Sequence, residues 1–244
     1  MAPTTAPAPP TEWRRYGRPR RDRWRTLVSG LGQTLVSAGL VLLLFVVYQL
    51  VWTNVEAGRQ QDAVADRIAD DWRRPTPVSA EAPPPPLRLG EGFAFIRIPR
   101  LGRGYNVPIV EGVRERELSR GVGHYPGTSR PGEVGNFAVA GHRATNGEPF
   151  RDLDRLRRGD AVVIETDTTW FTYVVDRTRI VKPTDVWVLE PVPGRPAAQP
   201  TRPLLTLTTC HPRWASTERM IVFGHLTEST PKAAGRPAAL GGGR

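Results

Sequence analysis

Cys210 is the residue of this sequence with the most distinctive chemistry, because it is the only cysteine in the chain. It ends an apolar and β-branched run, LLTLTTC, which predicts a strand. A cysteine nucleophile needs a basic or cationic partner that favours the thiolate, and a donor for the oxyanion of a tetrahedral intermediate. A lone thiol cannot form an intramolecular disulfide, and its alternative role is that of a small buried apolar side chain.

Arg219 and His142 are the residues that could serve such a thiol. Arg219 opens the next predicted strand, 220–226, and pairing of the two strands would place it on the same rim as Cys210. A guanidinium there stays charged and can bind an oxyanion, although it could also be a plain surface charge. His142 follows a predicted strand, NFAVA, and begins the polar loop HRATNG. An imidazole at a strand end can act as a general acid and base, while a single histidine is often structural.

The remaining histidines receive no catalytic assignment. His211 adjoins Cys210 and should point elsewhere, and His225 alternates along the last predicted strand. His124 is expected to stabilise a turn, with a position in a cleft as the alternative. No cluster of His, Cys, Asp or Glu has the spacing of a zinc site, and no EF-hand loop occurs. We predict no cofactor and no required metal, although three acidic residues could gather calcium: Glu148, Asp152 and Asp154.

The elements that must position these residues are short strands. Alternating apolar and polar residues between Gly, Pro, Asn and Asp turns predict them. Within the domain that begins near Phe93, helical spacing is confined to two short segments, 114–119 and 150–156. Many short strands with few helices favour a closed antiparallel barrel or a sandwich. The predicted strands are FAFIRI from Phe93, then 136–140, 161–165, 169–182, 186–189, 204–209 and 220–226.

An uncharged apolar stretch, Leu27 to Trp52, precedes this domain and is long enough to cross a bilayer, which takes about 20 residues. A cleaved signal peptide is the alternative, because small residues near Ala57 offer a plausible cut, but signal cores run only about 7 to 15 residues. Seven arginines lie within residues 1–25, and no basic residue occurs from Thr26 to Gly58. The N-terminus is therefore expected in the cytoplasm and the rest of the chain outside.

The charge of +10 is concentrated at the N-terminus, where the seven arginines face only Glu12 and Asp22. The rest of the chain carries no basic patch interleaved with stacking aromatics, which excludes nucleic-acid binding. Five segments are predicted: a disordered basic cytoplasmic tail (1–26), a transmembrane helix (27–53), a helical and then Pro-rich linker (54–91), a folded domain (92–229) and a disordered tail (230–244).

Three segments together resemble the sortase family, most of all the class E housekeeping sortases of high-GC Gram-positive bacteria: GVGHYPGTSRPGEVGNFAVAGHR, PFRDLDRLRRGD and TLTTCHPRWASTERMIV. The resemblance spans Phe93 to Leu226. The family signature T-L-x-T-C, followed by an Arg that begins the next strand, reads TLTTC with Arg219, and the family's A-G-H-R context contains His142. The resemblance implies an all-β fold, a closed eight-stranded barrel. It implies Cys210 as nucleophile, His142 as general acid and base, and Arg219 as stabiliser of substrate and oxyanion.

The resemblance also implies an activity and its partners. Sortases cleave C-terminal sorting signals of the LPxTG kind after Thr through a thioester, and an amine of a peptidoglycan precursor of the lipid II type resolves the thioester. Class E members are associated with LAxTG. The partners would be secreted proteins that carry such signals, and the enzyme would be a single-pass protein of the cell membrane with its catalytic domain outside.

Three other functions remain open. A pilin-polymerising sortase often has a lid and a second, C-terminal membrane helix, and the residues before Phe93 and after Leu226 show neither pattern. An extracytoplasmic cysteine protease would hydrolyse rather than transfer, but papain-like enzymes place Cys before His and carry a different cysteine context. A non-catalytic wall-binding module would tolerate loss of Cys210.

Overall fold

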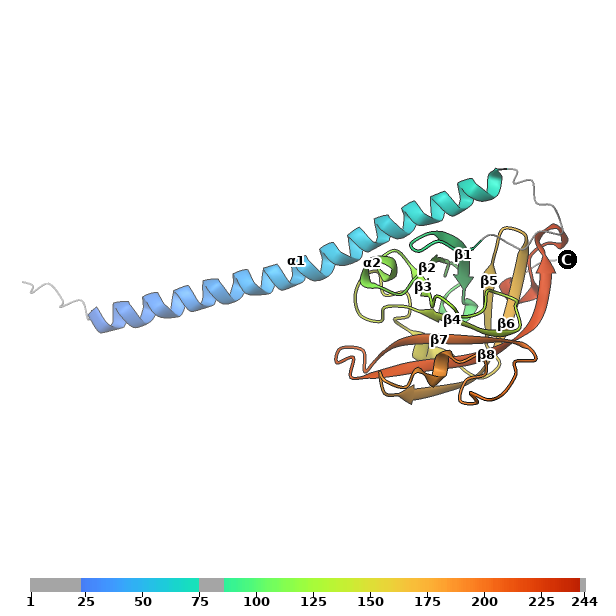
Figure 1. Cartoon of the computed structure of the whole chain (residues 1–244). Coiled ribbons are helices and arrows are strands. Elements are labelled where there is room, and N and C mark those ends of the chain that lie inside the picture. Colours follow the sequence, from blue (N-terminus) through green and yellow to red (C-terminus); the bar gives the residue numbers. More distant parts are fainter. Residues whose placement is uncertain (1–22, 75–85, 242–244) are drawn as a thin grey trace, which may run out of the picture. The chain divides into compact units, whose positions relative to one another are not determined.

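A computed structural model describes residues 23–74 and 86–241 of the 244-residue chain. Residues 1–22 of the predicted basic tail, the Pro-rich segment 75–85 and residues 242–244 lie outside the described residues. The chain divides into two compact units, Met1–Tyr48 and Gln49–Arg244. The helix α1 (Arg23–Arg73) runs through the boundary between them (Figure 1).

The first unit contains most of the apolar stretch. Its described side chains are exposed, and Leu42 is a representative example at 64%. Within the described residues, one helix is long and apolar enough to cross a membrane, and an 18-residue window of it reaches a mean hydropathy of 2.3. A signal sequence near an N-terminus has the same properties. The apolar helix is therefore consistent with a membrane anchor or with a signal sequence.

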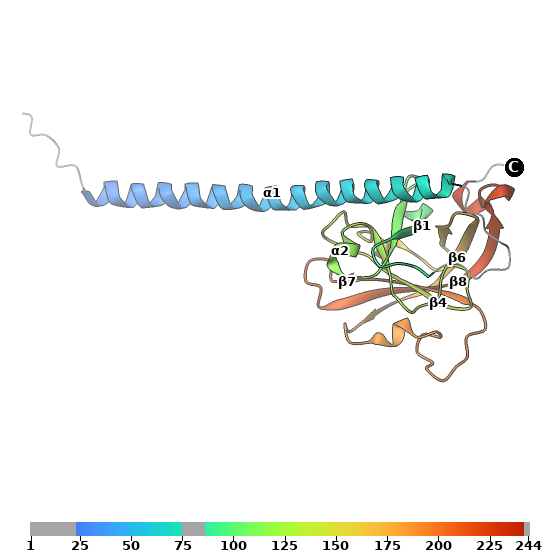
Figure 2. The same cartoon turned by 45° about the horizontal axis from the view of Figure 1, so that its top comes forward.

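The second unit is built on a closed barrel of eight strands among the described residues (Figures 1 and 2). Their order around the barrel is β1-β2-β3-β4-β7-β8-β6-β5, and β5 pairs with β1 to close it. The strands are β1 (Gly92–Arg97), β2 (Val107–Glu111), β3 (Val122–His124), β4 (Gly135–Ala140), β5 (Ala161–Glu165), β6 (Thr169–Val181), β7 (Pro203–His211) and β8 (Glu218–Pro231).

The barrel is mixed rather than antiparallel throughout. The β2–β3 and β4–β7 pairs are parallel, and the other pairs described are antiparallel. The closed barrel was expected, and so were six of its strands, but β2 and β3 were not. Every residue of β2 is buried, so it shows no alternation, and it contains Pro108; β3 has only three residues, one of them Gly123. A strand buried on both faces carries no period-2 signal.

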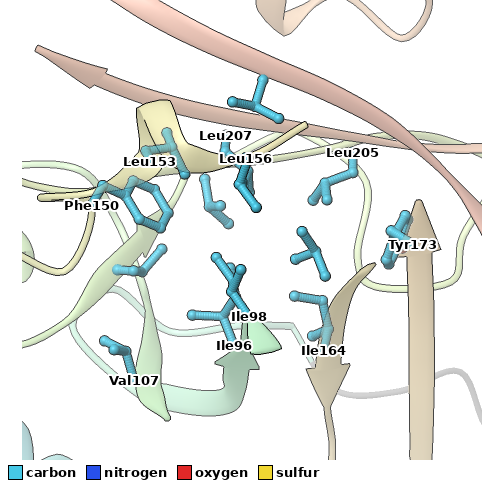
Figure 3. Packing of buried hydrophobic residues seen from close by; sticks show 14 of the residues in the cluster. Ile96, Ile98, Val107, Phe150, Leu153, Leu156, Ile164, Tyr173, Leu205 and Leu207 are labelled. Atoms are coloured by element: carbon cyan, nitrogen blue, oxygen red, sulfur yellow. The ribbon is translucent and has the colours of Figure 1, made fainter. Parts of the chain in front are cut away.

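The barrel interior is one apolar core. Figure 3 shows Leu205 and Leu207 of β7 in it, together with Ile96 of β1 and Ile164 of β5. Each of these four side chains is at most 1% exposed. Burial of this kind contributes about 25 cal/mol per Å² of apolar surface and gives the strands a rigid frame.

The short helices include one correction to the sequence prediction. Residues 186–189, expected as a strand, form the 3-10 helix η3 (Val186–Leu189). Its Val188 packs on Ile221 and Phe223, on the outer face of β8, so the apolar residues cover the barrel from outside instead of joining the sheet. The two predicted helical segments contain α2 (Glu115–Leu118) and η2 (Leu153–Arg155), and η1 (Pro99–Leu101) follows β1.

The flanking segments contain regular structure. The first part of the linker, expected to be helical, continues α1 to Arg73. The tail expected to be disordered contains the end of β8 and two 3-10 helices, η4 (Lys232–Ala234) and η5 (Ala238–Leu240). Lys232 explains part of this order, since its ammonium lies 2.9 Å from Glu165 and 3.8 Å from the centre of the Trp72 ring.

Candidate active site

Cys210 and Arg219 lie directly opposite each other on two neighbouring strands. The antiparallel register of β7 and β8 pairs them. Leu207 and Met220 point into the core. Side chains along a strand alternate between the two faces. Cys210 lies three residues after Leu207, and Arg219 lies next to Met220. Both therefore point to the outer face. The predicted nucleophile and guanidinium therefore share one face and one level of the barrel wall.

His142 follows β4, which lies on the other side of β7 from β8. In the parallel pair of β4 and β7, Val139 lies opposite Leu207, and both are buried in the core. His142 lies three residues after Val139, and Cys210 lies three residues after Leu207. Neighbouring strands lie about 4.8 Å apart, so the continued register brings the imidazole-bearing residue beside the thiol-bearing one. The three predicted site residues thus come from three adjacent strands or strand ends.

Hydrogen bonds confirm that this register continues past the end of β4. The Thr209 hydroxyl donates to the Gly141 carbonyl over 2.7 Å. Arg143, only 6% exposed, donates through Nη1 to His211 Nδ1 over 2.9 Å and to the Cys210 carbonyl over 3.4 Å. Its other terminal nitrogen lies 3.3 Å from Asp154. Arg143 therefore ties the backbone of Cys210 to the segment that carries His142, a role that the sequence did not reveal.

The imidazole of His142 is partly buried beside polar groups. Its Nε2 lies 3.4 Å from Glu115 Oε1 and 3.4 Å from the side-chain nitrogen of Asn146. Asn146 in turn donates to Glu115 over 2.6 Å. The ring therefore has a carboxylate and an amide as neighbours, and the carboxylate comes from α2.

The guanidinium of Arg219 is bound within its own loop. Its Nη1 donates to the carbonyl oxygens of Ser216 and Glu218, over 3.0 and 2.9 Å. Both hydrogen bonds are exposed, so solvent or another carbonyl group can replace either partner. Cys210 is half-buried and free of any disulfide.

Residues 142–150, called the histidine loop below, are held from several sides. The Phe150 amide donates to the His142 carbonyl over 3.0 Å and closes the loop. Phe150 itself is fully buried and points into the core in Figure 3. The Tyr105 hydroxyl donates to the Pro149 carbonyl over 2.7 Å. Burial raises the pKa of Tyr105, so its hydroxyl keeps the proton that this hydrogen bond requires.

Glu148 joins the histidine loop to residues 212–217, called the arginine loop below because they lead from β7 to Arg219. Its Oε2 lies 2.9 Å from Arg213 Nη2 and 3.4 Å from Arg151 Nη1. The Glu148 side chain is 11% exposed and that of Arg213 25%. The two loops that flank Cys210 are thus cross-linked by a largely buried ion pair, which the sequence did not reveal either.

The other histidines have structural partners. His124 is 2% exposed, and its Nδ1 lies 2.5 Å from Glu111 Oε2 while its Nε2 contacts Thr128 at 2.9 Å. It therefore packs inside the barrel, where it supports the turn after β3, and not in a cleft. His225 Nδ1 lies 2.9 Å from Asp176 on the neighbouring strand.

The acidic residues considered for calcium lie beside arginines. Glu148 pairs with Arg213, Asp154 with Arg143, and Asp152 lies 3.9 Å from Arg155. Among the described residues, no group of three or more His, Cys, Asp or Glu side chains is placed to hold a metal ion.

Comparison with known proteins agrees with this geometry. Residues 96–227 match the family model described as the sortase domain. Sortase SrtE1 of Streptomyces coelicolor is 39% identical, over 96% of this chain and 67% of the relative, and Sortase SrtE2 is 35% identical, over 87% and 88%. The structure of sortase E from Streptomyces avermitilis aligns with a TM-score of 0.58 and 48% identity, over 63% of this chain and 99% of that one.

A further solved structure, of Sortase E1 from Streptomyces coelicolor with a tripeptide in the active site, aligns with a TM-score of 0.57 and 39% identity, over 64% of this chain and 99% of that one. The fold and the family match define a cysteine transpeptidase. The chain belongs to the sortase family. Within it, the chain is similar to the class E sortases of Streptomyces.

Proposed function

We propose that this sortase cleaves C-terminal sorting signals of the LPxTG or LAxTG kind after Thr and transfers the protein to an amine of a peptidoglycan precursor. The observation that carries the proposal is the position of Cys210 directly opposite Arg219 on β7 and β8, with His142 two residues after the end of β4, the strand on the other side of β7. A thiol, an imidazole and a guanidinium close together are what acyl transfer through a thioester requires.

In the first step, the Cys210 thiolate attacks the carbonyl carbon of the Thr–Gly peptide bond, and the carbonyl oxygen becomes an oxyanion. Arg219 donates to this oxyanion, because a guanidinium always carries its proton and charge. The C–N bond then breaks, and the protonated His142 gives its proton to the leaving glycine amine. The Thr carbonyl remains on Cys210 as a thioester.

In the second step, the acceptor amine attacks the thioester carbonyl. His142, now neutral, takes a proton from the attacking nitrogen, the C–S bond breaks, and Cys210 leaves as the thiolate. The amide bond formed replaces the amide bond broken, so the transfer needs no ATP. Without an amine, water would resolve the thioester and the products would be those of hydrolysis.

Arg219 would exchange partners when substrate binds. Its two carbonyl acceptors belong to the exposed arginine loop. A carbonyl oxygen of the sorting signal offers the same kind of hydrogen bond, and rotation of the side chain toward Cys210 costs few buried contacts. Binding of the signal would therefore bring the guanidinium to the scissile carbonyl.

The membrane arrangement completes the proposal. We infer that α1 is retained as an anchor, with the arginine-rich end in the cytoplasm and the barrel outside, where sorting signals and wall precursors are found. Seven arginines before the apolar stretch and none within it support this orientation. The similarity to class E relatives supports a preference for LAxTG over LPxTG.

One assay tests the activity. The full chain in detergent micelles is incubated with LAxTG and LPxTG peptides, with and without an amine, and intact-protein and peptide masses are followed. The expected result is a thioester on Cys210 and a ligated product, with Cys210→Ala as the inactive control. Release of free acid alone in the presence of amine would indicate a cysteine protease. If wild type and Cys210→Ala give the same protein and peptide masses, the protein is a non-catalytic module.

A further inference from the structure

The C-terminal part of α1 presents one face to the barrel of the second unit. Residues on that face are spaced three or four apart, which places them on a single side of a helix. The buried members are Ala57, Val64 and Ile68, at 1 to 3% exposure. The whole stripe consists of Asn54, Ala57, Gln61, Val64, Ile68 and Trp72.

The apolar half of this stripe docks on β1 and β2. Val64 and Ile68 pack with Phe95 and Val110 in a small core of their own. A Cβ at Gly92 would lie 2.6 Å from Val64 and 2.8 Å from Ile68, so the helix approaches β1 as closely as a glycine permits. The helix is therefore seated on the barrel by packing, and this segment is not a free spacer.

The polar half of the stripe contacts the histidine loop. Asn54 Oδ1 accepts the Gly147 amide over 3.2 Å, and Asn54 Nδ2 lies 3.5 Å from Glu148 Oε1. Gln61 Nε2 donates to the Asn146 carbonyl over 3.5 Å. Three consecutive loop residues, four to six positions after His142, thus receive polar contacts from the helix.

These loop residues need outside support. Asn146 and Glu148 are non-glycine residues with positive φ, 53° and 48°, a backbone conformation that persists only where surrounding contacts determine it. Asn146 also lies 3.4 Å from the imidazole of His142, and Glu148 holds Arg213 of the arginine loop. The helix therefore contacts the residues that set the position of the ring and of the facing loop.

We propose that Asn54 and Gln61 are positioning residues for catalysis: the helix end that leads out of the apolar stretch holds the histidine loop in the geometry in which His142 serves the leaving and attacking amines. The inference rests on the proposed function for its catalytic part. Residues 54–72 would then position the histidine loop for transfer, in addition to any part they play in anchoring.

The test compares full-length variants in detergent micelles. Asn54→Ala/Gln61→Ala removes the polar contacts, and Asp62→Ala/Asp66→Ala changes two exposed positions of the same helix. Steady-state kinetics with an LAxTG peptide and an amine give kcat and KM. Amide hydrogen exchange is measured for a peptide covering residues 143–150 and for peptides from β4 and β7, which report global unfolding. Gly92→Ala, whose added Cβ would crowd Val64 and Ile68, perturbs the same docking from the barrel side.

The expected result is a fall in kcat of about tenfold for Asn54→Ala/Gln61→Ala with KM nearly unchanged, because misplacement of a catalytic group lowers the rate without altering the peptide contacts. Exchange should rise in 143–150 and stay unchanged in β4 and β7. Gly92→Ala should act in the same direction, and Asp62→Ala/Asp66→Ala should match wild type in both measurements.

Two results would overturn the inference. If Asn54→Ala/Gln61→Ala has the kcat of the wild type although hydrogen exchange in 143–150 is faster, the contacts of Asn54 and Gln61 have a structural role only. Unchanged exchange would show that the helix does not hold the loop. Both results can be distinguished from failure of the proposed function. If the proposed function is wrong, the wild type forms no ligated product. Hydrogen exchange would still show in that case whether the helix holds the histidine loop.

Discussion

The two loops that flank Cys210 are held in different ways. The histidine loop ends on the buried Phe150, accepts a hydrogen bond from Tyr105 and receives Asn54 and Gln61 from the helix. The arginine loop is mostly exposed: Trp214 is 74% exposed, and Arg219 binds carbonyls of the loop and its edge. If His142 is the general acid and base and Arg219 the oxyanion donor, as we propose, the first is placed before substrate arrives, while the second has only exposed hydrogen bonds to exchange for substrate. Preorganisation favours catalysis where proton transfer needs an exact distance, and mobility favours exchange of peptide substrates.

The largest effects should come from the two side chains themselves. His142→Gln should lower kcat/KM for an LAxTG peptide by about 10³-fold, because both steps lose their proton carrier. Arg219→Lys should lower it by about 10²-fold, because an ammonium supplies a charge without the planar fork. Neither change should move the unfolding midpoint by more than about 2 °C. Arg158→Lys, at an exposed position, is the control. Loss of activity there would mean that replacement of Arg by Lys lowers activity irrespective of position.

The link between the loops should matter next. Glu148→Gln removes the charge that faces Arg213. We expect the free energy of unfolding to fall by about 2 kcal/mol. This loss is smaller than for a fully buried ion pair, because the Arg213 side chain is a quarter exposed. Urea denaturation measures it. Asp152→Asn removes a longer, exposed pair with Arg155 and should cost less than about 0.5 kcal/mol. Equal costs for both variants would mean that the loops are not coupled through Glu148.

The support beneath the histidine loop predicts a smaller effect. Tyr105→Phe leaves the Pro149 carbonyl without its donor and should cost about 1 kcal/mol. Burial raises the pKa of Tyr105, so above pH 10 the unfolded chain loses this proton while the folded protein keeps it, and stability falls as pH rises. Tyr105→Phe should therefore flatten the alkaline loss of stability, measured by urea denaturation between pH 8 and 11. An unchanged slope would count against a buried, protonated hydroxyl.

The arginine loop should tolerate change best. Trp214→Ala removes an exposed ring, over which the Arg213 guanidinium lies 5.2 Å from the ring centre. We expect a change in unfolding free energy below about 0.5 kcal/mol, again by urea denaturation. A loss above about 1 kcal/mol would show that this loop is packed as firmly as the histidine loop, and the contrast between them would disappear.

Much of the site could be predicted because it follows from local patterns. The run that ends at Cys210 and the arginine that opens the next strand both belong to elements of period 2, and a hairpin brings their ends together. The order of His142, Cys210 and Arg219 is family-like. The register of β7 and β8 places Cys210 opposite Arg219, and His142 follows β4, which pairs with β7 on its other side. Residues 186–189 show the limit of this reasoning, since an apolar run of four residues cannot distinguish a strand from a helix that covers one.

The sequence by itself determined that a charge-free apolar helix precedes a β domain, and that a thiol, an imidazole and a guanidinium stand at strand ends. Spacing along the chain carries that information. Only the tertiary structure decided what holds these groups: Asn54 meets Glu148 across 94 positions, and Glu148 meets Arg213 across 65. Contacts between residues so far apart depend on how the barrel closes and where the helix is seated. Local propensity does not encode either, because the partners are chosen by packing.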